Sequence, residues 1–109
     1  MAGNSADSNE RAEIRRLASD PTEVRVTKSV EYSLLTHHLS KEDVCDEIVA
    51  WIDTGNRVKK VVLRGRHVGQ AAFEMKPRIN NVLFYFKLTL CELGEPGEYA
   101  LLISVHPDY

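Results

Sequence analysis

The segment NVLFYFKLTLCE, residues 81–92, places a phenol and an ammonium group on one side of a predicted strand. Side chains alternate along a strand, so Tyr85, Lys87 and Thr89 face one way. The opposite side is apolar and carries Val82, Phe84, Phe86 and Leu88. On the last predicted strand, Ser104 and His106 also fall on the polar side. Together these groups can bind a phosphate and move protons, although any sheet covered on one face also has a solvated face.

Tyr85 has a specific expected role beside Lys87. An ammonium group near a tyrosine favours the ionised phenol, so we expect Tyr85 to transfer protons or to bind a phosphate oxygen. Basic residues are also dense around the predicted sheet, namely Lys59, Lys60, Arg64, Arg66, Lys76 and Arg78. An anionic substrate would engage them through charge-assisted hydrogen bonds, and without one they are ordinary solvated side chains.

Other residue patterns exclude several kinds of site. His37 and His38 are consecutive, so on a helix they point about 100° apart and cannot grip a metal ion together. The chain has no phosphate-binding loop, dinucleotide fingerprint or serine-nucleophile elbow. Glu74 is either a candidate acid or base or a plain surface carboxylate. Cys45 and Cys91 lie far apart in apolar segments, which indicates reduced core residues rather than a zinc or redox pair.

Helices are predicted in the first half of the chain. Apolar residues at helical spacing indicate a helix over residues 9–19, and a short strand follows at 24–27. A second helix begins with Ser29 as its N-cap and runs through residue 36. The segment SKED, residues 40–43, is a capping box that opens a third helix, which ends at Gly55.

The second half alternates with a period of two. Strands are predicted at residues 58–63, 70–75, 82–92 and 98–105. Turns are predicted at RGRHVG, residues 64–69, and LGEPG, residues 93–97. The apolar row of the last strand is predicted to be Tyr99, Leu101, Ile103 and Val105. This order of elements predicts an α+β domain, with N-terminal helices packed on one face of a mostly antiparallel sheet.

Length and charge set further bounds. A chain of 109 residues is large enough for one core, so we expect a single domain over residues 9–109 after a disordered N-terminus of residues 1–8. The net charge of −2 gives no bulk attraction to nucleic acid, so anion binding must come from local clustering. We find neither a signal peptide nor a membrane-spanning stretch, which predicts no membrane partner and a cytoplasmic location.

A run of six blocks, from about Val24 to His106, resembles the MqsR toxins of bacterial type II toxin–antitoxin systems, which belong to the RelE-like superfamily. The blocks are VRVTKS, LSKEDVCDEI, RVKKV, EMKPR, YFKLTL and ALLISVH. VRVTKS is similar to the early VR(F/T)T(K/R)SA segment of that family, EMKPR to its DVYRPR, and YFKLTL to its YLKLTV. The resemblance implies a RelE-like α+β fold, an mRNA endonuclease activity that needs no metal or other cofactor, and a cognate antitoxin as partner. The substrate would be mRNA, free or on the ribosome.

The resemblance also implies site residues. The family's first active-site lysine falls on Lys60 and its tyrosine on Tyr85. Its C-terminal lysine falls on His106, and its glutamine falls on Ala72, so that Gln70, two positions earlier on the same strand face, is the candidate for the missing amide. These assignments predict three catalytic residues, Lys60, Tyr85 and His106, and no metal site.

The predicted chemistry is attack of the RNA 2′-hydroxyl on its own phosphate. His106 would serve as base or acid, and Tyr85 would position the phosphate or share proton transfer. The RNA- or phosphate-binding residues would be Lys87, Arg78, Lys76 and Gln70. The products would be a 2′,3′-cyclic phosphate and a 5′-hydroxyl. The alternatives are a catalytically impaired module of the same fold that acts through protein contacts, and a small hydrolase of another phosphoester.

Overall fold

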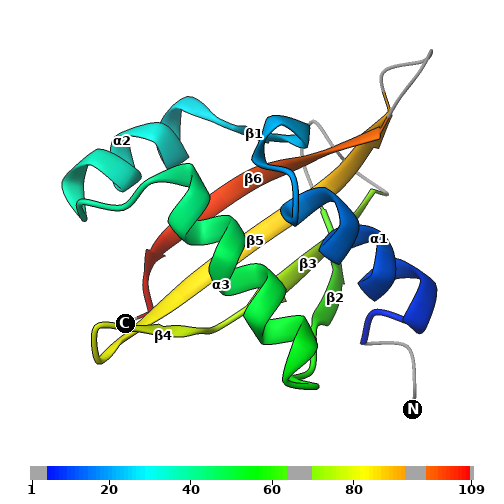
Figure 1. Cartoon of the computed structure of the whole chain (residues 1–109). Helices are drawn as coiled ribbons and strands as arrows, with labels where there is room; N and C mark the ends of the chain where they lie inside the picture. The colour runs from blue at the N-terminus through cyan, green and yellow to red at the C-terminus, as the bar shows by residue number, and fades with distance from the viewer. Residues whose placement is uncertain (1–4, 64–69, 93–97, 109) are drawn as a thin grey trace.

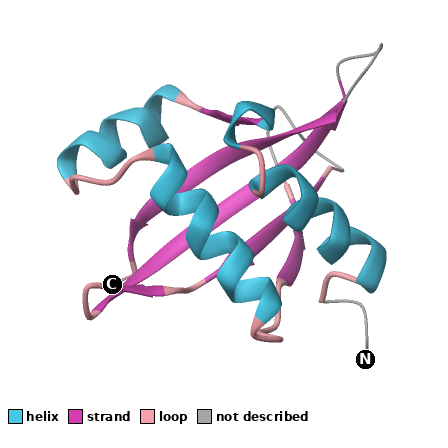
Figure 2. Ribbon diagram, in the orientation of Figure 1, coloured by secondary structure: helices cyan, strands magenta, loops and turns pink. Residues whose placement is uncertain are grey.

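The computed structural model of this chain describes residues 5–63, 70–92 and 98–108. The helices are α1 (Ser8–Ala18), α2 (Lys28–Thr36) and α3 (Lys41–Asp53), with a short 3-10 helix at Pro21–Glu23 between α1 and the first strand. The strands are β1 (Val24–Val26), β2 (Lys59–Val62), β3 (Ala71–Met75), β4 (Arg78–Ile79), β5 (Val82–Glu92) and β6 (Glu98–Pro107). Helices α1 and α3 cross one face of the sheet, and α2 lies beside β6 (Figures 1 and 2). The predicted α+β fold with N-terminal helices is confirmed.

The sheet has the strand order β1-β6-β5-β3-β2, with β4 paired to β5 off this path. The hairpin strands pair antiparallel, and β1 pairs parallel with β6. Both β4 and the parallel pairing of β1 were absent from the prediction. The predicted turns at 64–69 and 93–97 lie outside the described residues.

Side-chain caps fix where the helices begin. Ser40 forms the predicted capping box, because its hydroxyl accepts from the Asp43 amide at 3.0 Å and the Asp43 carboxylate accepts from the Ser40 amide at 2.9 Å. Helix α1 has a similar box formed by Asp7 and Glu10. The predicted N-cap of α2 was wrong by two residues: Thr27, not Ser29, accepts from the backbone of Val30.

Gly55 ends α3 as predicted. Its φ of +80° is the left-handed conformation that glycine adopts without a steric penalty. The Gly55 amide donates to the Ile52 carbonyl at 3.0 Å, and the Asn56 amide donates to the Trp51 carbonyl at 3.2 Å. These two bonds form the Schellman motif, which satisfies carbonyls that the end of a helix leaves unpaired.

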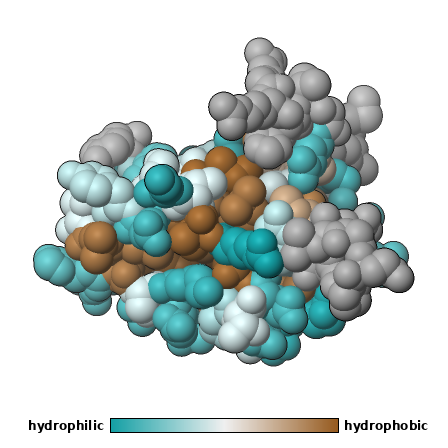
Figure 3. Space-filling view, turned by 90° about the horizontal axis from the view of Figure 1, so that it is seen from above, coloured by the Kyte–Doolittle hydropathy of each residue, from teal (hydrophilic) through white to brown (hydrophobic). Residues whose placement is uncertain are grey.

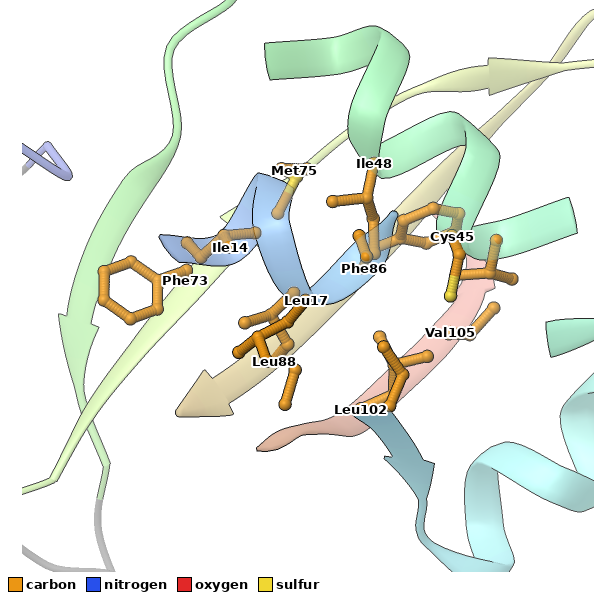
Figure 4. Packing of buried hydrophobic residues seen from close by; sticks show 14 of the residues in the cluster. Ile14, Leu17, Cys45, Ile48, Phe73, Met75, Phe86, Leu88, Leu102 and Val105 are labelled. Carbon is orange, nitrogen blue, oxygen red and sulfur yellow. The ribbon is translucent and has the colours of Figure 1, made fainter. Parts of the chain in front are cut away.

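The hydrophobic core lies between the helices and the sheet. Phe86 and Leu88 of β5 pack beneath Ile48 of α3 and Leu17 of α1, and all four side chains are almost fully buried (Figure 4). Cys45 is a free thiol in this core, as predicted, whereas Cys91 is a free thiol that is only partly buried and lies outside the core. Burial raises the pKa of the Cys45 thiol to about 11.

Strand β6 corrects one predicted row of side chains. Its buried residues are Ala100, Leu102 and Val105, in place of the predicted Tyr99, Leu101, Ile103 and Val105. The pairing with β5 shifts between Lys87 and Leu88, so that one residue of β6 is extra at this bulge. The alternation therefore changes phase within β6, which a strict period of two cannot predict.

Two smaller expectations also change. Val82, expected in the helix-facing row, is 44% exposed because it lies at the start of β5, beside the two-residue strand β4. Residues 5–8, expected to be disordered, have regular contacts: the Ala6 amide donates to the Val58 carbonyl at 2.9 Å, and Ser5 forms a bridge with Lys59. Residues 1–4 lie outside the described part.

No helix among the described residues is long and apolar enough to span a bilayer.

Candidate functional site

The candidate site lies on the sheet face opposite α1 and α3. Strand register brings its residues together from three neighbouring strands. Tyr85 of β5 lies directly across from His106 of β6, and Lys87 lies across from Ser104. On the other side, Lys87 pairs with Glu74 of β3. The predicted grouping of Tyr85, Lys87, Ser104 and His106 on one surface is therefore observed, and Glu74 joins it.

Tyr85 is held by Glu74. Its hydroxyl donates to Oε2 of Glu74 at 2.5 Å. Partial burial raises the pKa of Tyr85 above its usual range, and the hydrogen bond to Glu74 and its negative charge raise it further. The expectation of an ionised phenol beside Lys87 was wrong, since the carboxylate and burial outweigh the ammonium. Tyr85 is a neutral hydrogen-bond donor.

Lys87 and Glu74 form the charged centre of the surface. The Lys87 Nζ lies 3.8 Å from Oε2 of Glu74 and 5.9 Å from the centre of the Tyr85 ring. The two side chains are only 25% and 14% exposed, which limits screening of their charges by water. The sequence allowed Glu74 to be an acid or base but did not place it here. Its pairing with Lys87 follows from the β3–β5 register, which no local pattern sets.

His106 lies beside Tyr85, at the border of the group formed by Tyr85, Lys87 and Glu74. Its ring is 5.2 Å from the Tyr85 ring, centre to centre, with a tilt of 35°. Nδ1 of His106 is 2.8 Å from the backbone carbonyl of Pro107. A carbonyl only accepts hydrogen bonds, so Nδ1 carries the proton and the lone pair of the neutral ring is on Nε2.

Lys60 does not belong to this cluster. In the β2–β3 pairing it lies opposite Phe73, a core residue, and so points to the helix-covered face. Its Nζ binds Oε2 of Glu10 in α1 at 2.6 Å, and that carboxylate raises the pKa of Lys60. The lysine that pairs with Glu74, on the Tyr85 face, is Lys59. The expected trio of Lys60, Tyr85 and His106 is thus divided between two faces of the sheet.

Gln70 is displaced from Tyr85, whereas Arg78 lies on the same face of the sheet. Arg78 of β4 pairs with Leu83, which lies two residues before Tyr85 on the same face of β5, and it also lines a groove of about 220 Å³ together with Trp51 of α3. Gln70 donates to the Leu90 carbonyl at 3.0 Å. It lies four residues before Glu74 on its strand, or about 13 Å away at about 3.3 Å per residue. The Gln70 side chain is therefore too far away to bind a phosphate held at Tyr85.

Lys76, like Lys87, is a predicted phosphate-binding residue that lies near Tyr85. Its Nζ lies 3.3 Å from the Asp108 carboxylate, whose charge also raises the pKa of Tyr85. Thr89 has the predicted orientation, but it is fully buried and its hydroxyl donates to the Ala71 carbonyl at 2.7 Å. Thr89 is therefore a structural residue.

A groove of about 300 Å³ adjoins the cluster, between α2 and β6. His106 and Ser104 form part of its wall, and Tyr32, Ser33 and His37 of the α2 region form the other side. Sequence reasoning missed this groove, because only the docking of α2 against β6 creates it. Within the described residues, no group of three or more His, Cys, Asp or Glu side chains is arranged to hold a metal ion.

Comparison of the chain with models of protein families, with curated proteins and with solved structures found no match. Functional assignment therefore depends on the geometry of the sheet face and on the resemblance of the six sequence blocks.

Proposed function

We propose that this chain is a metal-independent endoribonuclease, the toxin of a toxin–antitoxin pair, and that it cleaves mRNA on the open face of its sheet. The observation that carries the proposal is the contact of Tyr85 with His106, with Lys87 on the same face. This surface supplies an imidazole, a neutral phenol and a cation within reach of one phosphodiester. The resemblance to the MqsR toxins, whose tyrosine falls on Tyr85, adds support.

The proposed reaction uses one group for each step. Nε2 of His106 takes the proton of the RNA 2′-hydroxyl, and the 2′-oxygen then attacks the adjacent phosphorus. The Lys87 ammonium stabilises the charge that grows on the phosphate oxygens. The bond from phosphorus to the 5′-oxygen breaks, and that oxygen receives a proton from the Tyr85 hydroxyl. The products are a 2′,3′-cyclic phosphate and a 5′-hydroxyl.

Glu74 has a supporting part in this scheme. In the protein without RNA, the Glu74 carboxylate accepts a hydrogen bond from the Tyr85 hydroxyl and balances the positive charge of Lys87. RNA binding replaces these contacts, because a phosphate oxygen can accept from both Tyr85 and Lys87. After the reaction the Tyr85 oxyanion regains a proton from the protonated His106, which restores both groups.

Cleavage of a defined mRNA in the presence of EDTA tests the proposal. The wild-type protein should cut the RNA, and His106→Ala and Tyr85→Phe should each slow cleavage by about 10²-fold or more. Lys59→Met is the matched control, because it removes a positive charge from the same face of the sheet and leaves His106 and Tyr85 in place. A folded wild-type protein that leaves every RNA intact would contradict the proposal, as would full activity of both variants.

The second candidate is a catalytically impaired module of this fold that acts through protein contacts. Two observations favour it: Lys60 lies on the opposite face, and Glu74 places a negative charge beside Tyr85. Normal growth of cells that express the folded chain, together with stoichiometric binding of a protein encoded by a neighbouring gene, would support this candidate. Growth arrest that requires His106 would support the nuclease. In either case the proposed setting is the bacterial cytoplasm, with an antitoxin as partner.

A further inference from the structure

The groove between α2 and β6 has features that the proposed reaction does not use. Helix α2 is anchored beside β6 by its buried residues Val30 and Leu34 and by the Ser33 hydroxyl, which donates to the Val105 carbonyl. The groove of about 300 Å³ lies between these two elements, and Ser33 and Val105 are part of its lining. Seen from above, from the side of α2 and β1, the molecule presents a band of hydrophobic side chains between hydrophilic borders (Figure 3).

The chemistry of the groove suits an uncharged polar group. Its lining contains hydroxyls, two imidazoles and a phenol, but no Asp, Glu, Lys or Arg side chain. A second groove in the described part contains Asp43, Asp46 and Glu47, and a third contains Glu47 beside Arg78. The acidic groove would repel a nucleic acid, whereas the neutral one can hold a base and its ribose.

Tyr32 and His37 place two aromatic rings on the α2 side of the groove. Tyr32 is 74% exposed, although a ring of this size is usually at least half-buried in a folded domain. The His37 ring is fixed by an edge contact with Phe84, whose ring centre is 5.6 Å away. An exposed aromatic ring beside a fixed one is the arrangement on which nucleic acid bases stack.

Two hydroxyl groups at the groove can accept hydrogen bonds from a ligand. The Thr36 hydroxyl donates to the Tyr32 carbonyl at 3.0 Å, and the Ser33 hydroxyl donates to the Val105 carbonyl. The hydrogens of these two hydroxyl groups are thus used in bonds within the protein. Each oxygen keeps a lone pair for an amino or hydroxyl group of a ligand.

The groove is continuous with the proposed catalytic surface. His106 and Ser104 belong to both, and His106 also contacts Tyr85. A phosphate at Lys87 and Tyr85 would therefore have one of its two nucleosides at the mouth of the groove. We propose that this groove binds the nucleoside next to the scissile phosphate, with its base stacked on Tyr32. This inference rests on the proposed nuclease function.

A binding experiment with an RNA that cannot be cleaved tests the proposal. The probes are fluorescent 2′-O-methyl hexanucleotides of adenine, cytosine and uracil and one of mixed sequence, titrated by anisotropy. Tyr32→Ala should weaken binding of the best probe about fivefold or more, the value expected for loss of about 1 kcal/mol of base stacking. Leu35→Ala is the matched control, since Leu35 is on the same helix, is also 74% exposed and does not line the groove.

The results distinguish the groove from the nuclease. Equal affinities of the wild type, Tyr32→Ala and Leu35→Ala would overturn the groove proposal, and so would equal losses in both variants. If the wild type cleaves RNA in that case, the nuclease stands without this subsite. If binding depends on Tyr32 but no RNA is cleaved, the groove is an RNA-binding site and the catalytic proposal fails. As a second readout, adenosine should shift the backbone amide signals of Ser33 and His37, and inorganic phosphate should not.

Discussion

Replacing Lys87 and Lys60 one at a time separates the geometry of the structure from the family resemblance. The resemblance assigns catalysis to Lys60, whereas the structure places Lys87 beside Tyr85 and Lys60 on the other face. We predict that Lys87→Met slows RNA cleavage by 10²- to 10³-fold, and that Lys60→Met changes the rate less than twofold.

The expected magnitudes follow from distance. A Lys87 ammonium about 4 Å from a phosphate charge, at an effective dielectric constant of about 20, contributes about 4 kcal/mol. Loss of one such stabilising group costs about 3 to 4 kcal/mol in the transition state, which is a factor of 10² to 10³. Lys60 lies two strands from β5, or about 10 Å at about 4.8 Å per strand, and points the opposite way. This separation exceeds the screening length of about 8 Å at physiological salt.

The assay is single-turnover cleavage of a labelled mRNA fragment at saturating protein. Circular dichroism and thermal unfolding show whether each variant is folded, and Lys87→Arg should recover much of the activity because it restores the positive charge. The reasoning is refuted if Lys60→Met abolishes cleavage while Lys87→Met remains active. In that event the helix-covered side of β2, and not the open face, would contain the reacting groups.

Three further predictions concern folding. Phe86→Ala should lower the free energy of unfolding by about 3 to 5 kcal/mol in urea titrations, because its ring is fully buried between sheet and helices, and a loss below about 1 kcal/mol would contradict this packing. Ser40→Ala should cost about 1 kcal/mol through the lost N-cap of α3, whereas Ser40→Asp should keep most of it. The pKa of Cys45 is raised from 9.0 to about 11 on folding, so the unfolded thiol ionises first and stability should fall as pH rises from 9 to 11. This part of the pH dependence should disappear in Cys45→Ala, and an unchanged slope would rule out Cys45 as its source.

The helices were predictable because their signals are local. The SKED segment and Gly55 mark the two ends of α3 through hydrogen bonds made within a few residues. The same holds for the apolar side of β5, where Phe84, Phe86 and Leu88 face the core. Tertiary contacts were not needed for either inference.

The errors about the sheet share a different cause, which is strand pairing. The face of Lys60 is set by its register with β3, and the phase of β6 is set by a bulge against Lys87. The hydrogen bond from Tyr85 to Glu74 also joins two strands. A sequence pattern gives the alternation within one strand, but it does not give the neighbour or the register. Lys60 was consequently expected on the same face as Tyr85, although its register places it on the opposite face.

The chemical nature of the RNA ends tests the central claim most directly. A defined RNA is incubated with the purified protein in the presence of EDTA, and the masses of the fragments are measured by mass spectrometry. The His106→Ala variant is treated in the same way. We predict 2′,3′-cyclic phosphate and 5′-hydroxyl ends from the wild type, and about 10²-fold fewer of them from the variant in the same time. Fragments with 3′-hydroxyl and 5′-phosphate ends, or intact RNA with folded wild-type protein, would contradict attack by the 2′-hydroxyl on this face of the sheet.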